Sequence, residues 1–159
     1  MESYTRLLGI AGFFLLVTAA SALLILDETR DRPYRATFAG TDAELRLETA
    51  ETFEERKKGL MHRHTLDQDA GMLFIYPGER DRTFWMKNTF IPLDIIFVDE
   101  NGTIVKIHEA EPQPFTADEE LSRYRSGRPA KYVIETHQGF SEDHGIEEGG
   151  TVSIRETSR

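Results

Sequence analysis

The chain has 159 residues and carries 28 Asp and Glu against 19 Lys and Arg, a formal net charge of −9 at pH 7. Nucleic-acid binding needs a basic footprint, so this acidic balance argues against DNA or RNA as a partner, and it suits a halophilic source. The absence of cysteine excludes disulfides, thiolate nucleophiles and thiolate metal sites.

The first predicted element is an N-terminal transmembrane helix. Residues 7–26 form an uncharged run of 20 residues, and at about 1.5 Å per residue a helix of this length spans a hydrocarbon core of about 30 Å. The alternative is a cleaved signal peptide, because Ala20-Ser21-Ala22 fits a small-x-small cleavage site. The apolar run continues past that site to Leu26, so residues 1–26 are predicted to be a membrane anchor or uncleaved signal.

Two features bear on the side of the membrane. Arg6 precedes the apolar run, whereas Arg30, Arg32 and Arg35 follow it. Counting these cations would place the domain in the cytoplasm, but the similarity of the run to a signal sequence favours the outside. We expect a single anchor in the cell membrane and an extracytoplasmic domain of the cell envelope.

Residues 27–42 are predicted to form a charged linker and the first strand, and residues 43–159 a single β-rich domain. Strands at 34–38 and 43–49 would form a hairpin, because Leu45 and Leu47 alternate with charged residues. A capping box that begins at Thr52 then predicts a short helix over 53–58.

Strands are next predicted at 71–76, 82–87, 93–98 and 103–109, in a meander whose last turn is Asn101-Gly102. The long connection over 109–130 is a candidate lid, because such loops in small domains are usually functional or mobile.

The chain is predicted to close with a strand at 131–136, a helical turn at 140–144 and a strand at 151–155. None of these elements alternates as a βαβ unit. The predicted fold is therefore mostly β (α+β), a small antiparallel barrel or sandwich with one or two short helices.

Candidate binding residues surround the only Trp. Lys87 and Asn88 follow Trp85 and Met86 at the end of a predicted strand, where they could offer a cation and an amide to an anion or a carbonyl. Trp85 could line a ligand groove, but a large aromatic residue beside a strand is more often packed in the core. The alternative for Lys87 and Asn88 is a solvated cation and a turn. Asp94 follows Pro92-Leu93 and could be buried, where a structural ion pair is the expected use and acid–base catalysis the alternative.

The sequence resembles the family known as domain of unknown function 192 over about residues 45–155. The matching motifs are Arg56, Gly59-Leu60-Met61, Arg63, Gly71-Met72-Leu73-Phe74, Phe84 to Thr89 and Ile91 to Asp94, with Tyr132 to Glu135, Gly139 and Ile146 to Val152 in the tail. The resemblance implies a small β-rich domain, often exported or tethered to a membrane, and it implies no established catalysis.

We expect a membrane-anchored binding module for an unknown small ligand or envelope protein. Its expected ligand-binding residues are Arg56, Arg63, Trp85, Met86, Lys87, Asn88 and Asp94. One alternative is an enzyme that acts on a small anionic or carbonyl substrate through Asp94, with Lys87 and Asn88 stabilising negative charge.

A third alternative is copper or zinc binding. His62 and His64 could ligate a metal from an extended segment, although His-x-His is a weak signal by itself. No nucleophile elbow and no phosphate-binding loop is present, and we predict no cofactor.

Overall fold

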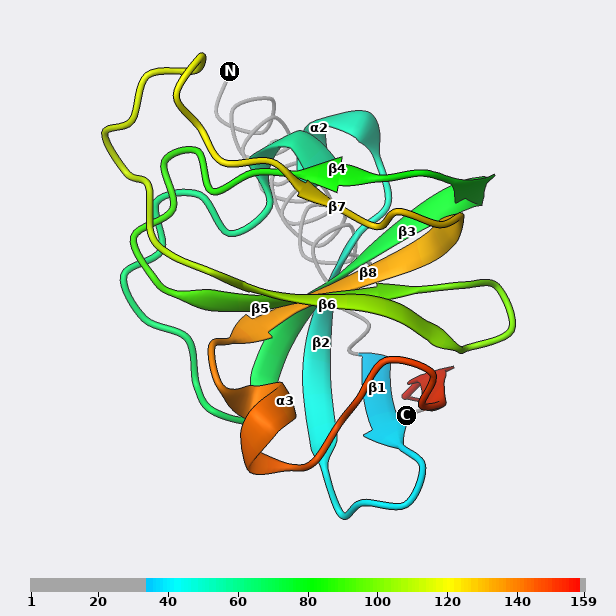
Figure 1. Ribbon diagram of the computed structural model, residues 1–159. Helices are drawn as coiled ribbons and strands as arrows, with labels where there is room; N and C mark the ends of the chain where they lie inside the picture. Colours follow the sequence, from blue (N-terminus) through cyan, green and yellow to red (C-terminus); the bar gives the residue numbers. More distant parts are fainter. Residues whose placement is uncertain (1–33, 158–159) are drawn as a thin grey trace, which may run out of the picture. The chain divides into compact units, whose positions relative to one another are not determined.

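The computed structural model describes residues 34–157, in which most of the regular structure is one curled half-barrel sheet (Figure 1). The elements are β1 (Tyr34–Phe38), β2 (Glu44–Ala50), α2 (Phe53–Lys58), β3 (Ala70–Arg80), β4 (Thr83–Phe84), β5 (Leu93–Val98), β6 (Ile104–Ala110), β7 (Tyr124–Arg125), β8 (Ala130–His137), α3 (Phe140–Asp143) and β9 (Val152–Glu156). Seven strands form the sheet in the order β6-β5-β8-β3-β2-β1-β9, and β4 pairs with β7 in a separate ribbon. The predicted mostly-β class with two short helices is confirmed for the described residues.

The two edge strands of the large sheet approach each other at their ends. Thr103 and Thr151 form an isolated antiparallel bridge, and the Ile104 amide donates to the Gly150 carbonyl at 2.9 Å. A sheet that curls until its edges meet leaves little unpaired backbone at that corner. This closure is partial, so the predicted barrel or sandwich is a half-barrel.

Two predictions about topology were wrong. No βαβ unit was predicted, but β2 and β3 pair in parallel, because the connection through α2 returns the chain to the end of the sheet at which β2 began. The predicted meander is also interrupted, since β8 pairs with both β3 and β5. The hairpins β1–β2 and β5–β6 are antiparallel, as predicted.

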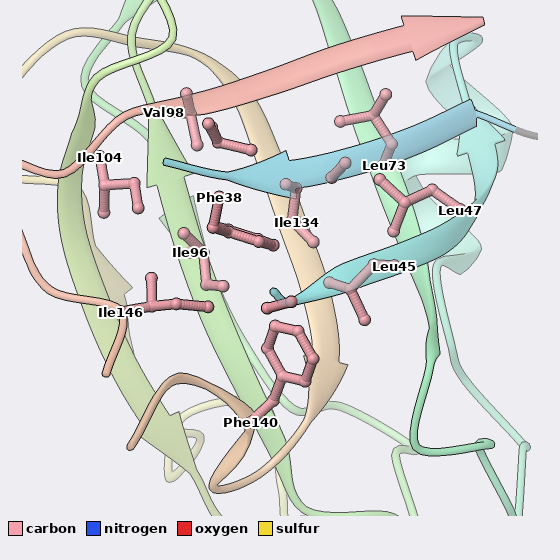
Figure 2. Packing of buried hydrophobic residues seen from close by; sticks show 13 residues of the cluster. Phe38, Leu45, Leu47, Leu73, Ile96, Val98, Ile104, Ile134, Phe140 and Ile146 are labelled. Atoms are coloured by element: carbon pink, nitrogen blue, oxygen red, sulfur yellow. The ribbon is translucent and has the colours of Figure 1, made fainter. Parts of the chain in front are cut away.

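The inner face of the sheet holds one apolar core. Figure 2 shows Phe38, Leu45, Ile96 and Ile134 pointing into the space between the strands, with Phe140 of α3 below them. The rings of Phe38 and Phe140 lie 5.7 Å apart. This core fixes β1, β2 and β9 against the central strands.

A second core lies on the opposite face of the central strands. On β3, Met72 and Phe74 belong to this second core, whereas Leu73 faces the first core. On β5, Ile95 and Phe97 also belong to the second core. Because neighbouring residues of a strand point to opposite faces, these strands are buried on both sides. The elements α2, β4 and β7 lie close together, at the top of the view in Figure 1.

The strand predicted at 82–87 is wrong beyond its first residues. Only Thr83–Phe84 pair as a strand, and Met86 then turns inward with no exposed surface. Asn88 follows with φ of 52°, a left-handed backbone that ends any extended run.

The predicted membrane anchor at 1–26 lies outside the described residues. Between residues 34 and 157 the structure contains no helix long and apolar enough to cross a bilayer.

Candidate ligand pocket

A cavity of about 690 Å³ opens where the end of α2 meets β3 and the stretch that follows β4. Its volume is typical of a site for a small organic molecule. Five aromatic side chains and six cations contribute to its walls. The lining residues are Phe53, Arg56, Lys57, Lys58, Gly59, Leu60, Met61, Phe74, Tyr76, Pro77, Gly78, Arg80, Arg82, Thr83, Phe84, Trp85, Lys87, Thr89 and Glu135.

The position of α2 follows from its two ends. The Thr52 hydroxyl accepts from the Glu55 amide at 3.2 Å, and the Glu55 carboxylate accepts from the Thr52 amide at 2.9 Å. This is the predicted capping box. The helix ends at Gly59, whose φ of 47° and close approach to Phe74 favour glycine, since a Cβ there would lie 3.1 Å from the ring. The basic last turn of α2 is thereby held over the second core.

Two arginines lie over the Tyr76 ring. The guanidinium carbon of Arg82 lies 3.7 Å from the ring centroid and that of Arg56 lies 4.7 Å from it. Arg56 also donates to the Ile75 carbonyl at 3.0 Å and to that of Glu51. Arg82 donates to the Ala130 carbonyl at 3.1 Å and to that of Gly78. Backbone carbonyls and an aromatic ring fix both cations without neutralising them.

The pocket cations are largely free of acidic partners. Among residues 34–157, Lys87 is the one pocket cation with an ion pair, to Asp118 at 2.6 Å. The ion pairs of other basic residues, such as Arg46 with Asp69, lie outside the lining. The pocket is therefore cationic although the protein as a whole is strongly acidic. A cationic pocket attracts anions.

Glu135 is the one acidic residue of the pocket lining. It pairs in the sheet with Met72 on β3 and Ile95 on β5, so apolar strands flank it on both sides. Its side chain is buried, and no group between residues 34 and 157 forms a hydrogen bond or ion pair with it. Burial raises the pKa of the Glu135 carboxyl to about 8, since desolvation disfavours the charged form. The carboxyl is therefore mostly neutral at pH 7.

Three of the predicted ligand-binding residues line this pocket: Arg56, Trp85 and Lys87. Trp85 is 39% exposed, and the guanidinium of Arg123 lies 4.8 Å from its ring centroid. The indole is therefore a surface wall of the pocket and no part of either core.

The other four predicted ligand-binding residues, Met86, Asn88, Arg63 and Asp94, do not line the pocket. Met86 is fully buried in the second core. Asn88 forms a turn, and its carbonyl accepts from the His62 amide at 2.9 Å. Arg63 donates to both oxygens of Glu48 at 2.6 and 2.5 Å. This guanidinium holds the pKa of Glu48 below its usual range.

Backbone amides hold the carboxylate of Asp94 in place. Its two carboxylate oxygens accept from the Gly139 amide at 3.1 Å and the Ser141 amide at 2.8 Å. These amides lie at the start of α3, so the side chain holds that helix against β5. Asp94 does not contribute to the pocket that contains Lys87.

His62 and His64 lie against Phe90, with ring centroids 6.4 and 4.5 Å from it. In the described part of the chain, no three or more His, Asp or Glu side chains gather in a group that could hold a metal ion.

The segment 109–130 lies along the stretch that carries Trp85 and Lys87. Besides the Asp118 ion pair, the Gln113 amide donates to the Thr89 carbonyl at 3.2 Å, and β7 pairs with β4. These contacts fix the segment beside the pocket wall, and none of its residues lines the cavity.

Sequence reasoning missed Tyr76, Arg82 and Glu135. A detectable sign for Glu135 was that Val133 and Ile134, with side chains on opposite faces of β8, are both apolar. A strand that is apolar on both faces is central, and an acidic residue within it is expected to be buried. Tyr76 and Arg82 offered no comparable sign.

The family model described as "Uncharacterized ACR" matches residues 35–154, which is most of the chain. The chain belongs to the DUF192 family. The resemblance inferred from the motifs is therefore confirmed, and the matched range contains every pocket residue.

Two solved structures are similar to this DUF192 domain. One is a candidate transcription regulator from Sinorhizobium meliloti 1021, with 32% identity, a TM-score of 0.68, and coverage of 77% of this chain and 92% of that one. The other is a protein of unknown function from Novosphingobium aromaticivorans DSM 12444, with 34% identity, a TM-score of 0.67, and coverage of 76% and 83%. No curated protein gave a significant match.

Proposed function

We propose that this DUF192 domain is a binding module for a small anionic molecule that carries an apolar or aromatic part. The main support is the composition of the pocket, in which six cations face one mostly neutral carboxyl in a protein of net charge −9. An anion gains from such a concentration of positive charge, and more so where the walls exclude water.

The aromatic walls define the rest of the ligand. Phe53 is 69% exposed at the rim, and Phe74 meets Phe84 edge to face with centroids 5.0 Å apart. Exposed aromatic surface beside fixed cations is suited to a ligand with one charged end and one flat or apolar end.

Membrane attachment is part of the proposal. Its support is the uncharged run over 7–26, and the signal-like character of that run favours a domain outside the cytoplasm. Native membranes washed with alkaline carbonate should retain the protein, and protease added to spheroplasts should cleave it. Release of the protein by carbonate would contradict the membrane anchor. Full protection of the protein from protease in intact spheroplasts would contradict the extracytoplasmic orientation.

Calorimetric titration of the full-length chain with benzoate, phenyl phosphate and inorganic phosphate tests the binding role. Lys57 and Lys58 are exposed pocket residues without an ion pair among the described residues. The double variant Lys57→Gln/Lys58→Gln should weaken binding of the aromatic anions about tenfold, at up to about 1 kcal/mol for each exposed charge.

The matched control is Arg128→Gln/Arg155→Gln, which removes the same charge from exposed positions outside the pocket. It should change affinity less than about twofold at moderate salt, where distant charges are screened. Equal losses in both double variants, or no binding of any anion, would contradict the proposal.

A further inference from the structure

We infer that the ligand of this pocket is a zwitterion, whose anionic group meets the rim cations and whose amine pairs with Glu135 on the floor. The inference rests on the proposed function and narrows its ligand class. It is carried by the burial of Glu135 and by the contacts that hold Arg56, Arg82 and Lys87 elsewhere.

Among residues 34–157 the Glu135 carboxyl has no hydrogen-bond or ion-pair partner, and its neighbours in the sheet are the apolar Met72 and Ile95. Glu135 is 5% exposed, and a Cβ at Gly59 would lie 3.8 Å from one of its carboxyl oxygens and 3.1 Å from Phe74. A buried carboxyl normally finds a hydrogen-bond partner, because leaving it unpaired is unfavourable. A partner entering through the pocket would remove this penalty.

Residues 34–157 do not supply that partner. Arg56 and Arg82 are fixed on Tyr76 and on backbone carbonyls. Lys87 is paired with Asp118. The remaining ionisable groups of the pocket are Lys57 and Lys58 on α2, Tyr76 and Arg80 on β3, and none forms an ion pair or hydrogen bond with Glu135. No cation of residues 34–157 pairs with Glu135, which leaves that position to a cation of the ligand.

The walls around the floor favour an ammonium group. Phe74, Tyr76 and Phe84 present aromatic rings to the cavity, and rings attract desolvated cations. A hydrogen bond between ammonium and carboxylate is about twice as strong as one between neutral groups. With a pKa of about 8 for Glu135, ionising the carboxyl at pH 7 weakens binding only about tenfold. A ligand with a neutral carbonyl group would not require ionisation of Glu135. Its hydrogen bond to the neutral carboxyl would be weaker than the bond between ammonium and carboxylate.

Pairing with an amine requires loss of a proton. At pH 7 the Glu135 carboxyl carries the proton and the free ligand amine is already an ammonium. When they pair, the site keeps one proton fewer than the separated partners, and the buffer takes it up. An acceptor ligand without an amine would leave the proton on Glu135 and release none.

Calorimetry of the full-length chain at pH 7 tests this with matched pairs: 3-phenylpropionate and phenylalanine, succinate and aspartate, ethyl phosphate and ethanolamine phosphate. Repeating each titration in buffers of different ionisation heat counts the protons released. We expect an amine-bearing member to bind at least about tenfold more tightly than its partner and to release close to one proton. In Glu135→Gln the preference and the proton release should vanish, while binding of the plain anion persists.

Several results would overturn the inference. The first is equal affinity for both members of every pair whose plain anion binds. The second is tighter binding of the amine-bearing member without proton release. The third is a preference for the amine-bearing member that survives in Glu135→Gln. In these cases the anion site of the proposed function stands. If none of the six compounds binds the wild-type chain, the inference fails, and the proposed function fails as well if benzoate and phenyl phosphate also do not bind. Binding of the plain anion by Glu135→Gln shows that the variant is folded.

Discussion

At the scale of single residues, the buried carboxyl of Glu135 lowers the stability of this domain. A central strand flanked by Met72 and Ile95 would be better packed with an apolar or neutral residue. Burial keeps the carboxyl protonated in the folded state to about pH 8, whereas in the unfolded chain it ionises near the ordinary glutamate pKa of 4.5. Folding and proton uptake are therefore linked at this residue.

The sign of the linkage gives a prediction. Between about pH 4.5 and 8 the folded state holds more protons than the unfolded state, so the free energy of unfolding falls as pH rises. At about 1.4 kcal/mol for each pKa unit, the loss is a few kcal/mol. Glu135→Gln should flatten this dependence and be more stable than the wild type at pH 8.5, as measured by urea unfolding across the range.

The matched control is Glu48→Gln. Arg63 lowers the pKa of Glu48, so the stability that Glu48 contributes is present above its unfolded pKa and is lost only in acid. This variant should keep the wild-type slope between pH 5 and 8.5. The same slope in Glu135→Gln as in the wild type would show that Glu135 is ionised in the folded protein.

At the scale of elements, the pocket depends on how α2 ends. The sequence predicted both bounds of this helix, because the capping box at Thr52 and the Gly59 stop are local signals. The same local logic located β1, β5 and the β5–β6 hairpin. The β4–β7 ribbon was missed, because it depends on contacts between Phe84 and Tyr124 that are remote in sequence.

Gly59→Ala tests the role of this helix end. A side chain at φ of 47° is strained, and its Cβ would press on Phe74, so we expect a loss of about 1–3 kcal/mol in the free energy of unfolding. Because Phe74 lines the pocket, affinity for phenyl phosphate should fall too. Chemical unfolding and calorimetry measure the two effects.

The matched control is Gly78→Ala. Gly78 also lines the pocket, but no atom lies within 4 Å of the position its Cβ would take. It should change stability by less than about 0.5 kcal/mol. Similar losses in both variants would show that the approach of α2 to Phe74 is not what shapes the site.

At the scale of the whole molecule, charge and topology determine where the site lies. The sequence predicted a binding site around Trp85, and of the predicted residues Arg56, Trp85 and Lys87 line one cavity. It could not show that β8 lies between β3 and β5, because strand order is fixed by long-range pairing. Without that order, neither the position of Glu135 opposite the basic end of α2 nor the hydrogen bonds of Asp94 to the start of α3 could be predicted.

The measurement that tests the account most directly is an NMR titration of the isotope-labelled full-length chain, in mild detergent, with phenyl phosphate. We predict saturable shifts of the amides of residues 56–61, 74–76, 82–87 and 135, and little change around Asp94, His62 and α3. Shifts centred on Phe90 and His64, or spread evenly over the basic surface, would contradict a ligand site between α2 and β3.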